Sequence, residues 1–331
     1  MSNTDQTELK PVLEIVNLVT AFPTRSGAFR AVDDVSLALY PGKTLCVVGE
    51  SGSGKSVMSR SILQIVDEPG RIESGSILLH PGQSGRHKVV DLAKLNPRGP
   101  HIKGIRGREI AMIFQEPMSS LSPVHKIGDQ VAEAARIHDG LTPREARSRA
   151  VELLQKVEIP NPETAIDRYP FEFSGGMRQR AMIAMALACN PDILIADEPT
   201  TALDVTIQAE ILQLLKSLQQ KNNMSILFIT HDMGVVAEIA DEVAVMRHGR
   251  VLERGNVFDI FANPQHDYTK TLLRAARSAE APSERRLAMR SKRPLGDPIL
   301  RTENLRKEYQ LSAGFLGRGG QKLLAVHDAD I

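Results

Sequence analysis

The stretch that decides the fold of this chain is Gly49-Glu50-Ser51-Gly52-Ser53-Gly54-Lys55-Ser56. It fits the pattern G-x-x-x-x-G-K-[ST], in which glycines let consecutive backbone N–H groups turn toward one anion. A buried strand is predicted before it at residues 44–48, and a helix after it at residues 57–66 adds its N-terminal dipole. The pattern predicts a loop for nucleotide phosphates, in which Lys55 reaches the β- and γ-phosphates and the Ser56 hydroxyl ligates Mg²⁺. The other predicted contacts are Gly49, Ser51, Gly52, Ser53 and Gly54.

Apolar runs that alternate with helical patterns extend this picture along the chain. Each run is short and ends at a polar turn, as in strands buried on both faces; they are Ala111–Phe114, Ile193–Ala196, Ile226–Ile229 and Val243–Met246. Strands that alternate with helices predict an α/β fold with a mostly parallel sheet. Residues 118–172 carry no strand pattern and include a charged amphipathic helix at Glu145–Val157, so we expect a helical insertion there.

Composition excludes several classes of protein. With 331 residues the chain is expected to form about two units, and its net charge of +1 gives no basic excess for nucleic acid. Cys46 and Cys189 lie in apolar runs, which predicts two buried thiols in a reducing compartment. The longest apolar run, Ala181–Cys189, falls far short of the roughly 20 residues of a spanning helix. The polar start lacks the apolar core of a signal peptide, so a cytoplasmic location is expected.

An acidic pair is the predicted partner of the loop. Asp197 and Glu198 close the apolar run Ile193–Ala196, and the carboxyl ends of parallel strands face the ligand crevice. Asp197 is therefore predicted to hold Mg²⁺, directly or through water. Glu198 follows immediately and is predicted to polarise an attacking water.

The segment Phe173-Ser174-Gly175-Gly176-Met177-Arg178-Gln179-Arg180 narrows the interpretation. It resembles the signature motif of ABC ATPases, usually written LSGGQ, with Phe173 and Met177 in place of the usual Leu and Gln. From the residues alone, Ser174 caps a helix and the two glycines expose backbone N–H groups, which makes another anion site. The resemblance implies that Ser174, Gly175 and Gly176 contact a nucleotide that a second domain binds.

Further residues match the other motifs of that family in the expected order. Gln115 matches the Q-loop, and His231 matches the switch histidine of the H-loop. Asp204 closes the D-loop match, which runs Thr201-Ala202-Leu203-Asp204. The adenine-stacking aromatic matches Phe22, with Phe29 as the alternative.

The resemblance implies a role for each matched residue. The implied catalytic residues are Glu198, His231 and Gln115; the implied Mg²⁺ ligands are Ser56, Gln115 and Asp197; and Phe22 and Asp204 are implied nucleotide contacts. The implied fold is a P-loop NTPase of the ABC ATPase type. It has a mostly parallel core sheet, an antiparallel β subdomain and an inserted helical subdomain.

Three stretches resemble the oligopeptide/dipeptide importer branch of the family. They are Ile113–Pro123, Asp197–Thr206 and Asn263–Leu273, the last of which is close to a P-x-H-P-Y-T-x-x-L-L tail with Asp267 at one Pro position. The branch implies a subunit that binds and hydrolyses ATP to energise peptide import, at the cytoplasmic face of the bacterial inner membrane. Implied partners are integral-membrane permease subunits, a second ABC domain and, indirectly, a periplasmic peptide-binding protein, but not nucleic acid.

Two alternative functions stay open. A non-transport ABC ATPase of translation or DNA repair shares these motifs. Repair members carry long coiled-coil insertions between loop and signature, however, and the 125 residues from Gly49 to Ser174 leave no room for one. A paralogue that binds without turnover usually lacks the Glu or the His, whereas Glu198 and His231 are both present.

The C-terminal part of the chain contains an apparent repeat. Pro298–Leu305 resembles Pro11–Leu18 at a spacing of 287 residues, which also sets Tyr309 opposite Phe22, and Ala325–Asp328 resembles Ala31–Asp34. We expect an ABC nucleotide-binding domain at 11–277, a basic, solvated linker at 278–297 and the start of a truncated second ABC domain at 298–331. The alternative is an unrelated C-terminal hairpin, and whether residue 331 is a natural end stays open.

Overall fold

The computed structural model describes residues 10–25, 27–81, 88–115, 120–201, 203–280, 300–310 and 322–330. The chain divides into two compact units, Met1–Arg277 and Ser278–Ile331, which we describe separately. Most of the predicted linker, together with Ala202 of the D-loop match, lies outside the described residues.

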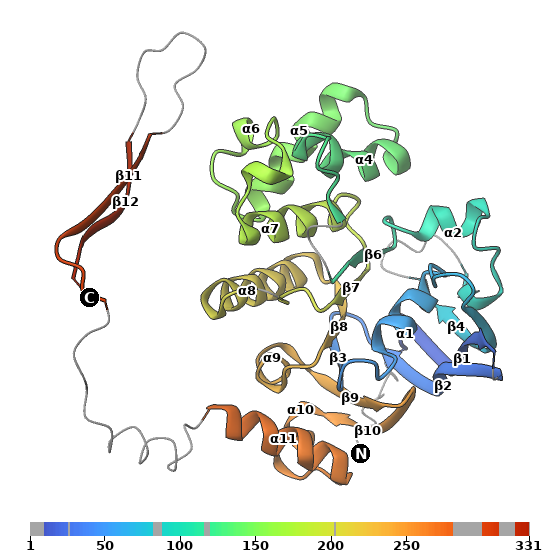
Figure 1. Ribbon diagram of the computed structural model, residues 1–331. Helices are drawn as coiled ribbons and strands as arrows, with labels where there is room; N and C mark the ends of the chain where they lie inside the picture. The colour runs from blue at the N-terminus through green and yellow to red at the C-terminus, as the bar shows by residue number, and fades with distance from the viewer. Residues whose placement is uncertain are drawn as a thin grey trace, which may run out of the picture. The chain divides into compact units, whose positions relative to one another are not determined.

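A six-stranded sheet forms the centre of the first unit (Figure 1), with the strand order β10-β9-β3-β8-β7-β6. In that order the strands span Arg250–Asn256, Glu242–Arg247, Thr44–Val48, Ser225–Thr230, Ile193–Asp197 and Ile110–Ile113. Neighbours from β9 to β6 pair in parallel, whereas β10 pairs antiparallel with β9 at one edge. All five predicted apolar runs are strands of this sheet, so the predicted α/β fold with a mostly parallel core is confirmed.

Alternate residues of each central strand point to opposite faces of the sheet, and both faces are covered. In β3, Cys46 and Val48 join one apolar core, whereas Leu45 and Val47 join the other. A strand buried on both faces has no polar side, which explains why these runs are continuously apolar. Cys46 and Cys189 are both buried, as predicted.

A four-stranded sheet of order β2-β1-β4-β5 accompanies the central sheet. Its strands span Gly27–Leu39, Leu13–Thr24, Arg71–Leu79 and Val90–Asp91, and all of its pairs are antiparallel. Helix α1 (Lys55–Ile62) contributes Met58 and Ile62 to the core that both sheets share. The short segments η1 (Leu92–Lys94) and α2 (Pro100–Ile105) follow β5. The predicted antiparallel β region is therefore present.

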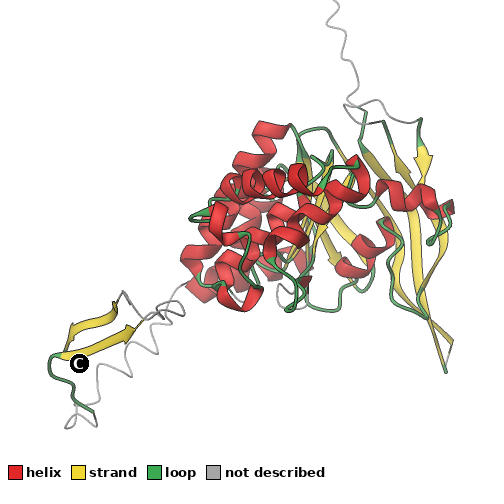
Figure 2. Cartoon of the chain, turned by 90° about the horizontal axis from the view of Figure 1, so that it is seen from above, coloured by secondary structure: helices red, strands yellow, loops and turns green. Residues whose placement is uncertain are grey.

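A group of helices lies between β6 and β7 in the sequence, within residues 127–186. They are α4 (Ile127–Asp139), α5 (Pro143–Lys156), α6 (Pro162–Ala165), η2 (Pro170–Glu172) and α7 (Gly175–Ala186). The predicted helix at 145–157 is α5, which begins two residues earlier because Thr142 and Glu145 form a capping box. Most helices lie together on one side of the unit, and the long strands of the antiparallel sheet lie on the other (Figure 2).

The remaining helices of this unit follow the strands β7 to β10. They are α8 (Val205–Asn222), α9 (Met233–Ile239), α10 (Val257–Ala262) and α11 (Asp267–Glu280). In α8 the apolar stripe of Ile211, Leu214, Leu215 and Leu218 is buried. Among the residues that the structure describes, no helix is long and apolar enough to cross a membrane.

The second unit contains the hairpin β11 (Leu305–Gln310) and β12 (Lys322–Ala329). Its register pairs Leu305 with Ala329, Lys307 with Val326 and Tyr309 with Leu323. The hairpin β1–β2 pairs Leu18 with Val35, Thr20 with Val32 and Phe22 with Phe29. Both hairpins have register shifts at the matching places, and Asn17, Asp34, Asn304 and Asp328 all have a positive φ. The two hairpins therefore share one register as well as a sequence pattern.

Candidate nucleotide-binding site

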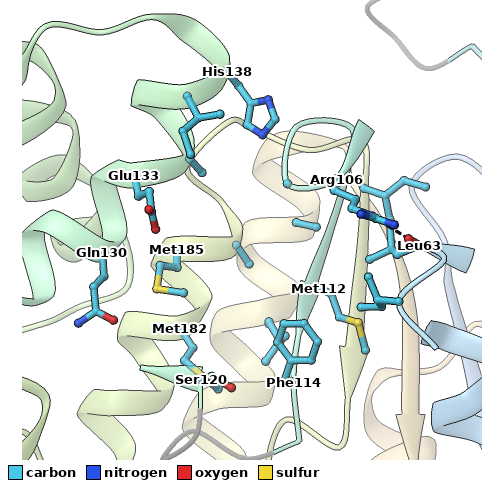
Figure 3. A pocket seen from close by; sticks show the side chains of 18 residues that line it. Leu63, Arg106, Met112, Phe114, Ser120, Gln130, Glu133, His138, Met182 and Met185 are labelled. Carbon is cyan, nitrogen blue, oxygen red and sulfur yellow. Dashed lines mark hydrogen bonds between the residues drawn. The ribbon is translucent and has the colours of Figure 1, made fainter. Parts of the chain in front are cut away.

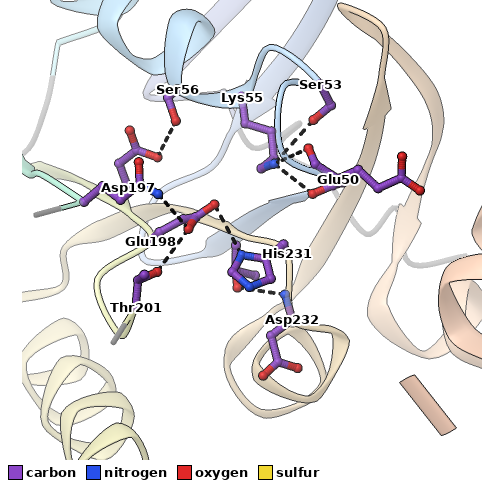
Figure 4. A network of polar contacts seen from close by, with 12 residues as sticks. Glu50, Ser53, Lys55, Ser56, Asp197, Glu198, Thr201, His231 and Asp232 are labelled. Atoms are coloured by element: carbon purple, nitrogen blue, oxygen red, sulfur yellow. Dashed lines mark hydrogen bonds and ion pairs between the residues drawn. The ribbon is translucent and has the colours of Figure 1, made fainter. Parts of the chain in front are cut away.

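The phosphate loop lies between β3 and α1 and closes around the Lys55 ammonium. Lys55 Nζ donates to the Gly49 carbonyl oxygen at 2.8 Å, to the Glu50 carbonyl oxygen at 2.9 Å and to Ser53 Oγ at 3.3 Å (Figure 4). The residue is only 4% exposed. Burial lowers the pKa of Lys55, and the nearby Glu198 and Asp197 carboxylates oppose that effect. A buried cation held only by carbonyl and hydroxyl oxygens is well placed to exchange them for an anion.

Glycine is required at two places where the loop meets other backbone. A Cβ on Gly49 would lie 2.1 Å from the Met246 carbonyl oxygen, and a Cβ on Gly54 would lie 2.1 Å from the Ala31 carbonyl oxygen. Gly54 also has a φ of 101°, which side-chain-bearing residues rarely adopt. The loop therefore packs tightly between strand β9, which contains Met246, and strand β2, which contains Ala31.

Ser56 and Asp197 come together at the base of the loop. The Ser56 hydroxyl donates to Asp197 Oδ1 at 3.0 Å, although 141 residues separate them in sequence. Asp197 is only 1% exposed, and this burial raises the pKa of its carboxyl group, against the opposing effect of the Ser56 hydrogen bond. A buried carboxylate beside a hydroxyl supplies the oxygen ligands that Mg²⁺ prefers. The described residues contain no cluster of three or more His, Cys, Asp and Glu side chains.

Glu198 is the centre of a hydrogen-bonded network at the end of β7. Its Oε2 accepts from Gln115 Nε2 at 3.0 Å and from Thr201 Oγ1 at 3.0 Å, and its Oε1 lies 3.3 Å from His231 Nδ1 (Figure 4). Its φ of 47° is in the left-handed region, and its backbone N–H donates to the Ile229 carbonyl oxygen at 2.9 Å. The network brings together Glu198, Gln115 and His231, which the sequence predicted. Thr201 was missed as a site residue, and its place within the D-loop match was the available signal.

A cavity of about 250 Å³ opens above the loop. Its lining includes loop residues, Gln115 and Glu198, and also both candidate aromatics, Phe22 and Phe29. These two residues are cross-strand partners in β1 and β2. A Cβ on Gly70 would lie 2.4 Å from the Phe22 ring, which shows that Phe22 packs on this glycine, whereas Phe29 is 61% exposed.

The signature residues and Asp204 do not line this cavity. Ser174 begins α7, as predicted, and its side chain accepts from the Met177 N–H at 3.3 Å. A Cβ on Gly176 would lie 2.9 Å from Ile207 Cγ2, so this glycine also lets α7 approach α8. Asp204 caps α8 by accepting from the Ile207 N–H at 2.9 Å.

A glycine-rich loop that precedes a helix, with a lysine inside it and a buried strand-end carboxylate bonded to its serine, defines a P-loop nucleotide-binding protein. Residues 32–201 match the family model described as ABC transporter. A Brucella melitensis protein whose name describes a peptide import ATP-binding protein is 54% identical over 267 residues, which cover 80% of this chain and 78% of that protein. The chain therefore belongs to the ABC transporter family.

Other relatives extend the comparison. Glutathione import ATP-binding protein GsiA of Escherichia coli K12 is 43% identical over 345 residues, which cover 98% of this chain but only 55% of GsiA. A dimeric ATP-binding cassette, in a post-hydrolysis state with ADP and Pi, is 26% identical with a TM-score of 0.63, over 74% of this chain and 98% of that one. The cbiO1 protein of Clostridium perfringens, part of the ABC transporter complex cbiONQ, is 26% identical with a TM-score of 0.62 and covers 82% and 100%.

Proposed function

We propose that this chain binds and hydrolyses ATP to energise the import of peptides. The observation that carries the proposal is the position of Glu198, a carboxylate held by hydrogen bonds on the wall of the cavity that contains the phosphate loop. The substrate class follows from the names of the relatives, which refer to peptide import and to glutathione import. None of these names refers to translation or DNA repair, so the non-transport alternative is not favoured.

In this proposal the loop and the base of the cavity hold MgATP. Lys55 leaves the Gly49 and Glu50 carbonyl oxygens and pairs with the β- and γ-phosphates, while Ser56, Asp197 and Gln115 supply oxygen ligands for Mg²⁺. The fit rests on the 3.0 Å contact between the Ser56 hydroxyl and the buried Asp197 carboxylate. When bound, Mg²⁺ neutralises charge on the phosphate oxygens.

Glu198 is proposed to polarise the attacking water. Gln115 and Thr201 both donate to its Oε2, and Oε1 is the oxygen that lies beside His231. His231 is proposed to move from Glu198 to the γ-phosphate when ATP is present. A positioned general base typically contributes about 10²–10⁴ in rate, so the rest of the rate enhancement is assigned to charge stabilisation around the phosphates.

A complete site is proposed to need two domains facing head to tail. Ser174, Gly175, Gly176 and Asp204 lie outside the lining of the cavity in their own chain, so a contact with nucleotide requires a second domain. A similar solved structure is described as a dimer, which supports this arrangement. The aromatic pair Phe22 and Phe29 is proposed to stack on adenine within the first domain.

We propose the division of the chain into a nucleotide-binding domain at 11–277, a linker at 278–297 and the opening of a second ABC domain at 298–331. The shared register of β1–β2 and β11–β12 supports the last assignment, with Tyr309 at the position of Phe22. The second domain that completes the site is proposed to be either the ABC domain that opens at 298 or another copy of the chain.

The integral-membrane permease subunits are proposed to dock in a separate apolar groove. This groove, of about 400 Å³, lies between the helical region and the end of β6 (Figure 3). Its lining includes Met112, Phe114, Met182 and Met185, and Phe114 directly precedes Gln115. An apolar helix of a permease subunit seated here would lie beside the nucleotide site. In this proposal the chain lies peripherally at the cytoplasmic face of the inner membrane, and a periplasmic peptide-binding protein is an indirect partner.

Lys55→Ala tests the proposed function most directly. Because Lys55 pairs with phosphate in the bound ground state, its loss is expected to weaken binding of labelled ATP by about tenfold or more. Lys94→Ala is the control, since Lys94 is an exposed cation that pairs with Asp91 away from the cavity. Unchanged ATP affinity in Lys55→Ala would exclude the phosphate-loop function.

A dilution series tests the two-domain site. Specific ATPase activity should rise with protein concentration, whereas constant turnover by a proven monomer would contradict the two-domain site.

Ile137→Asp tests the groove, because Ile137 lines it and is largely exposed. The ATPase activity of the isolated protein is expected to stay at the wild-type level, while association with membranes that carry the permease subunits is lost. Val124→Asp is the matched control, since Val124 is an exposed apolar residue outside the groove lining. Normal membrane association of Ile137→Asp would remove the groove from the proposal.

A further inference from the structure

A buried tyrosine of helix α11 forms a hydrogen bond with the backbone of the phosphate loop. The phenol oxygen of Tyr268, in α11, accepts a 3.2 Å hydrogen bond from the backbone N–H of Glu50, 218 residues earlier. Tyr268 is only 5% exposed and does not line the cavity. It therefore contacts the loop without occupying the space for a nucleotide.

Neighbouring groups fix the direction of the phenol. Glu253 of β10 accepts from the Gln265 N–H at 2.6 Å and from the His266 N–H at 3.0 Å, which fixes the start of α11. The Tyr268 N–H donates to His266 Nδ1 at 3.1 Å. The Arg247 guanidinium lies 4.5 Å from the centre of the Tyr268 ring, a cation–π distance. These contacts hold the start of α11 and the Tyr268 ring in place.

Tyr268 and Lys55 bind the two backbone groups of Glu50, its N–H and its carbonyl oxygen respectively. Lys55 Nζ donates to the Glu50 carbonyl oxygen at 2.9 Å, whereas Tyr268 accepts from the Glu50 N–H. When Lys55 turns to phosphate, it gives up the carbonyl oxygen. The Tyr268 contact does not depend on the phosphate, so it can keep the Glu50 peptide in place through that exchange.

We propose that Tyr268 is a positioning residue for the phosphate loop: it fixes the Glu50 peptide, so that the loop keeps its anion-binding shape while Lys55 engages the phosphates. The inference rests on the proposed function, because it takes ATP to be the ligand of the loop. It gives the tail segment 263–273, which in the sequence served only as a family marker, a physical role at the nucleotide site.

Tyr268→Phe tests the proposal, because it removes the hydroxyl and leaves the ring under Arg247. The loop then spends less time in its binding shape, and apparent affinity falls with that fraction. We expect the Kd for MgATP to rise about five- to tenfold, with kcat at saturating ATP changed by less than about twofold and with the melting temperature nearly unchanged. Tyr40→Phe is the matched control, since Tyr40 follows β2 and does not line the cavity.

Hydrogen exchange of the nucleotide-free protein supplies a second measurement. Amides of the peptide that contains residues 49–54 should exchange faster in Tyr268→Phe than in the wild type and in Tyr40→Phe. Unchanged exchange and unchanged Kd overturn the proposal. So does a parallel loss of affinity, kcat and melting temperature, which indicates a merely structural role. Failure of the wild type itself to bind ATP contradicts the proposed function instead, while the exchange comparison still decides the role of Tyr268.

Discussion

The hydroxyl of Ser56 donates a 3.0 Å hydrogen bond to the carboxylate of Asp197, and this contact joins the phosphate loop to the end of strand β7. The loop and the strand each have a local pattern that predicts them. Their contact depends on the sheet order, because β8 separates β3 from β7. The pair brings one hydroxyl and one buried carboxylate to the place where a phosphate-bound cation would sit.

Asp197→Asn is expected to stabilise the protein in the absence of nucleotide. Burial raises the pKa of the Asp197 carboxyl above its ordinary value of 3.8, so the native state binds its proton more tightly than the unfolded chain does. The free energy of unfolding therefore falls as the pH rises through the window between those two pKa values. At pH 7 the melting temperature of the variant should exceed that of the wild type by about 2 °C or more.

Two further observations check the sign of this effect. The advantage of Asp197→Asn should shrink as the pH is lowered toward the ordinary carboxyl pKa, because the wild-type side chain then becomes neutral as well. MgATP should stabilise the wild type more than the variant. A variant that is less stable than the wild type at pH 7 would show that the charged carboxylate is favourable in the native protein.

Glu198→Gln should keep ATP binding and nearly abolish hydrolysis. The substitution preserves the size of the side chain but removes the carboxylate that is proposed to polarise water, and it spares Lys55 and Ser56. The turnover rate should fall by about 10²–10⁴, with nucleotide trapped in a closed dimer. Steady-state ATPase assays and gel filtration with ATP measure both effects. Near wild-type turnover would remove Glu198 from the catalytic role.

Phe22→Ala and Phe29→Ala should differ in stability but not in nucleotide binding. Each ring lines the cavity, so each loss should weaken binding of a fluorescent ATP analogue by about tenfold, as expected for base stacking. Only Phe22→Ala should also lower the melting temperature, because Phe22 packs on Gly70 whereas Phe29 is exposed. Phe258→Ala is the control, an exposed ring that does not line the cavity. Unchanged affinity in either variant excludes that ring from the adenine site.

Gly176→Ala should destabilise the protein, whereas Gly175→Ala should not. A Cβ on Gly176 would lie 2.9 Å from Ile207 Cγ2, but a Cβ on Gly175 would find its nearest neighbour, Leu203 Cδ2, at 3.9 Å. Overpacking of this kind typically costs about 1–3 kcal/mol. Urea unfolding of both variants measures the difference, and adding Ile207→Ala should recover part of the loss. Equal stability of the two variants would mean that α8 shifts away from residue 176 without a loss in the free energy of unfolding.

The local sequence determined the strands and the phosphate loop. The five apolar runs became β3, β6, β7, β8 and β9 because a strand covered on both faces needs apolar residues throughout, and this requirement shows in any short window of sequence. The glycine pattern at residues 49–56 likewise prescribes a backbone shape by itself. The family motifs predicted Gln115, Glu198 and His231 as site residues. The fold brings these three side chains together.

The tertiary structure decided the features of the site that arise from contacts between segments far apart in the sequence. The left-handed backbone of Glu198 arises where its N–H bonds to Ile229 of the next strand, and no propensity of a glutamate predicts that conformation. The sequence offered Phe22 or Phe29 as alternatives, whereas the hairpin register places both at the cavity. The contact between Tyr268 and Glu50 spans 218 residues. Such contacts follow from how the sheets and helices pack, and a local pattern carries no information about which distant group will arrive beside it.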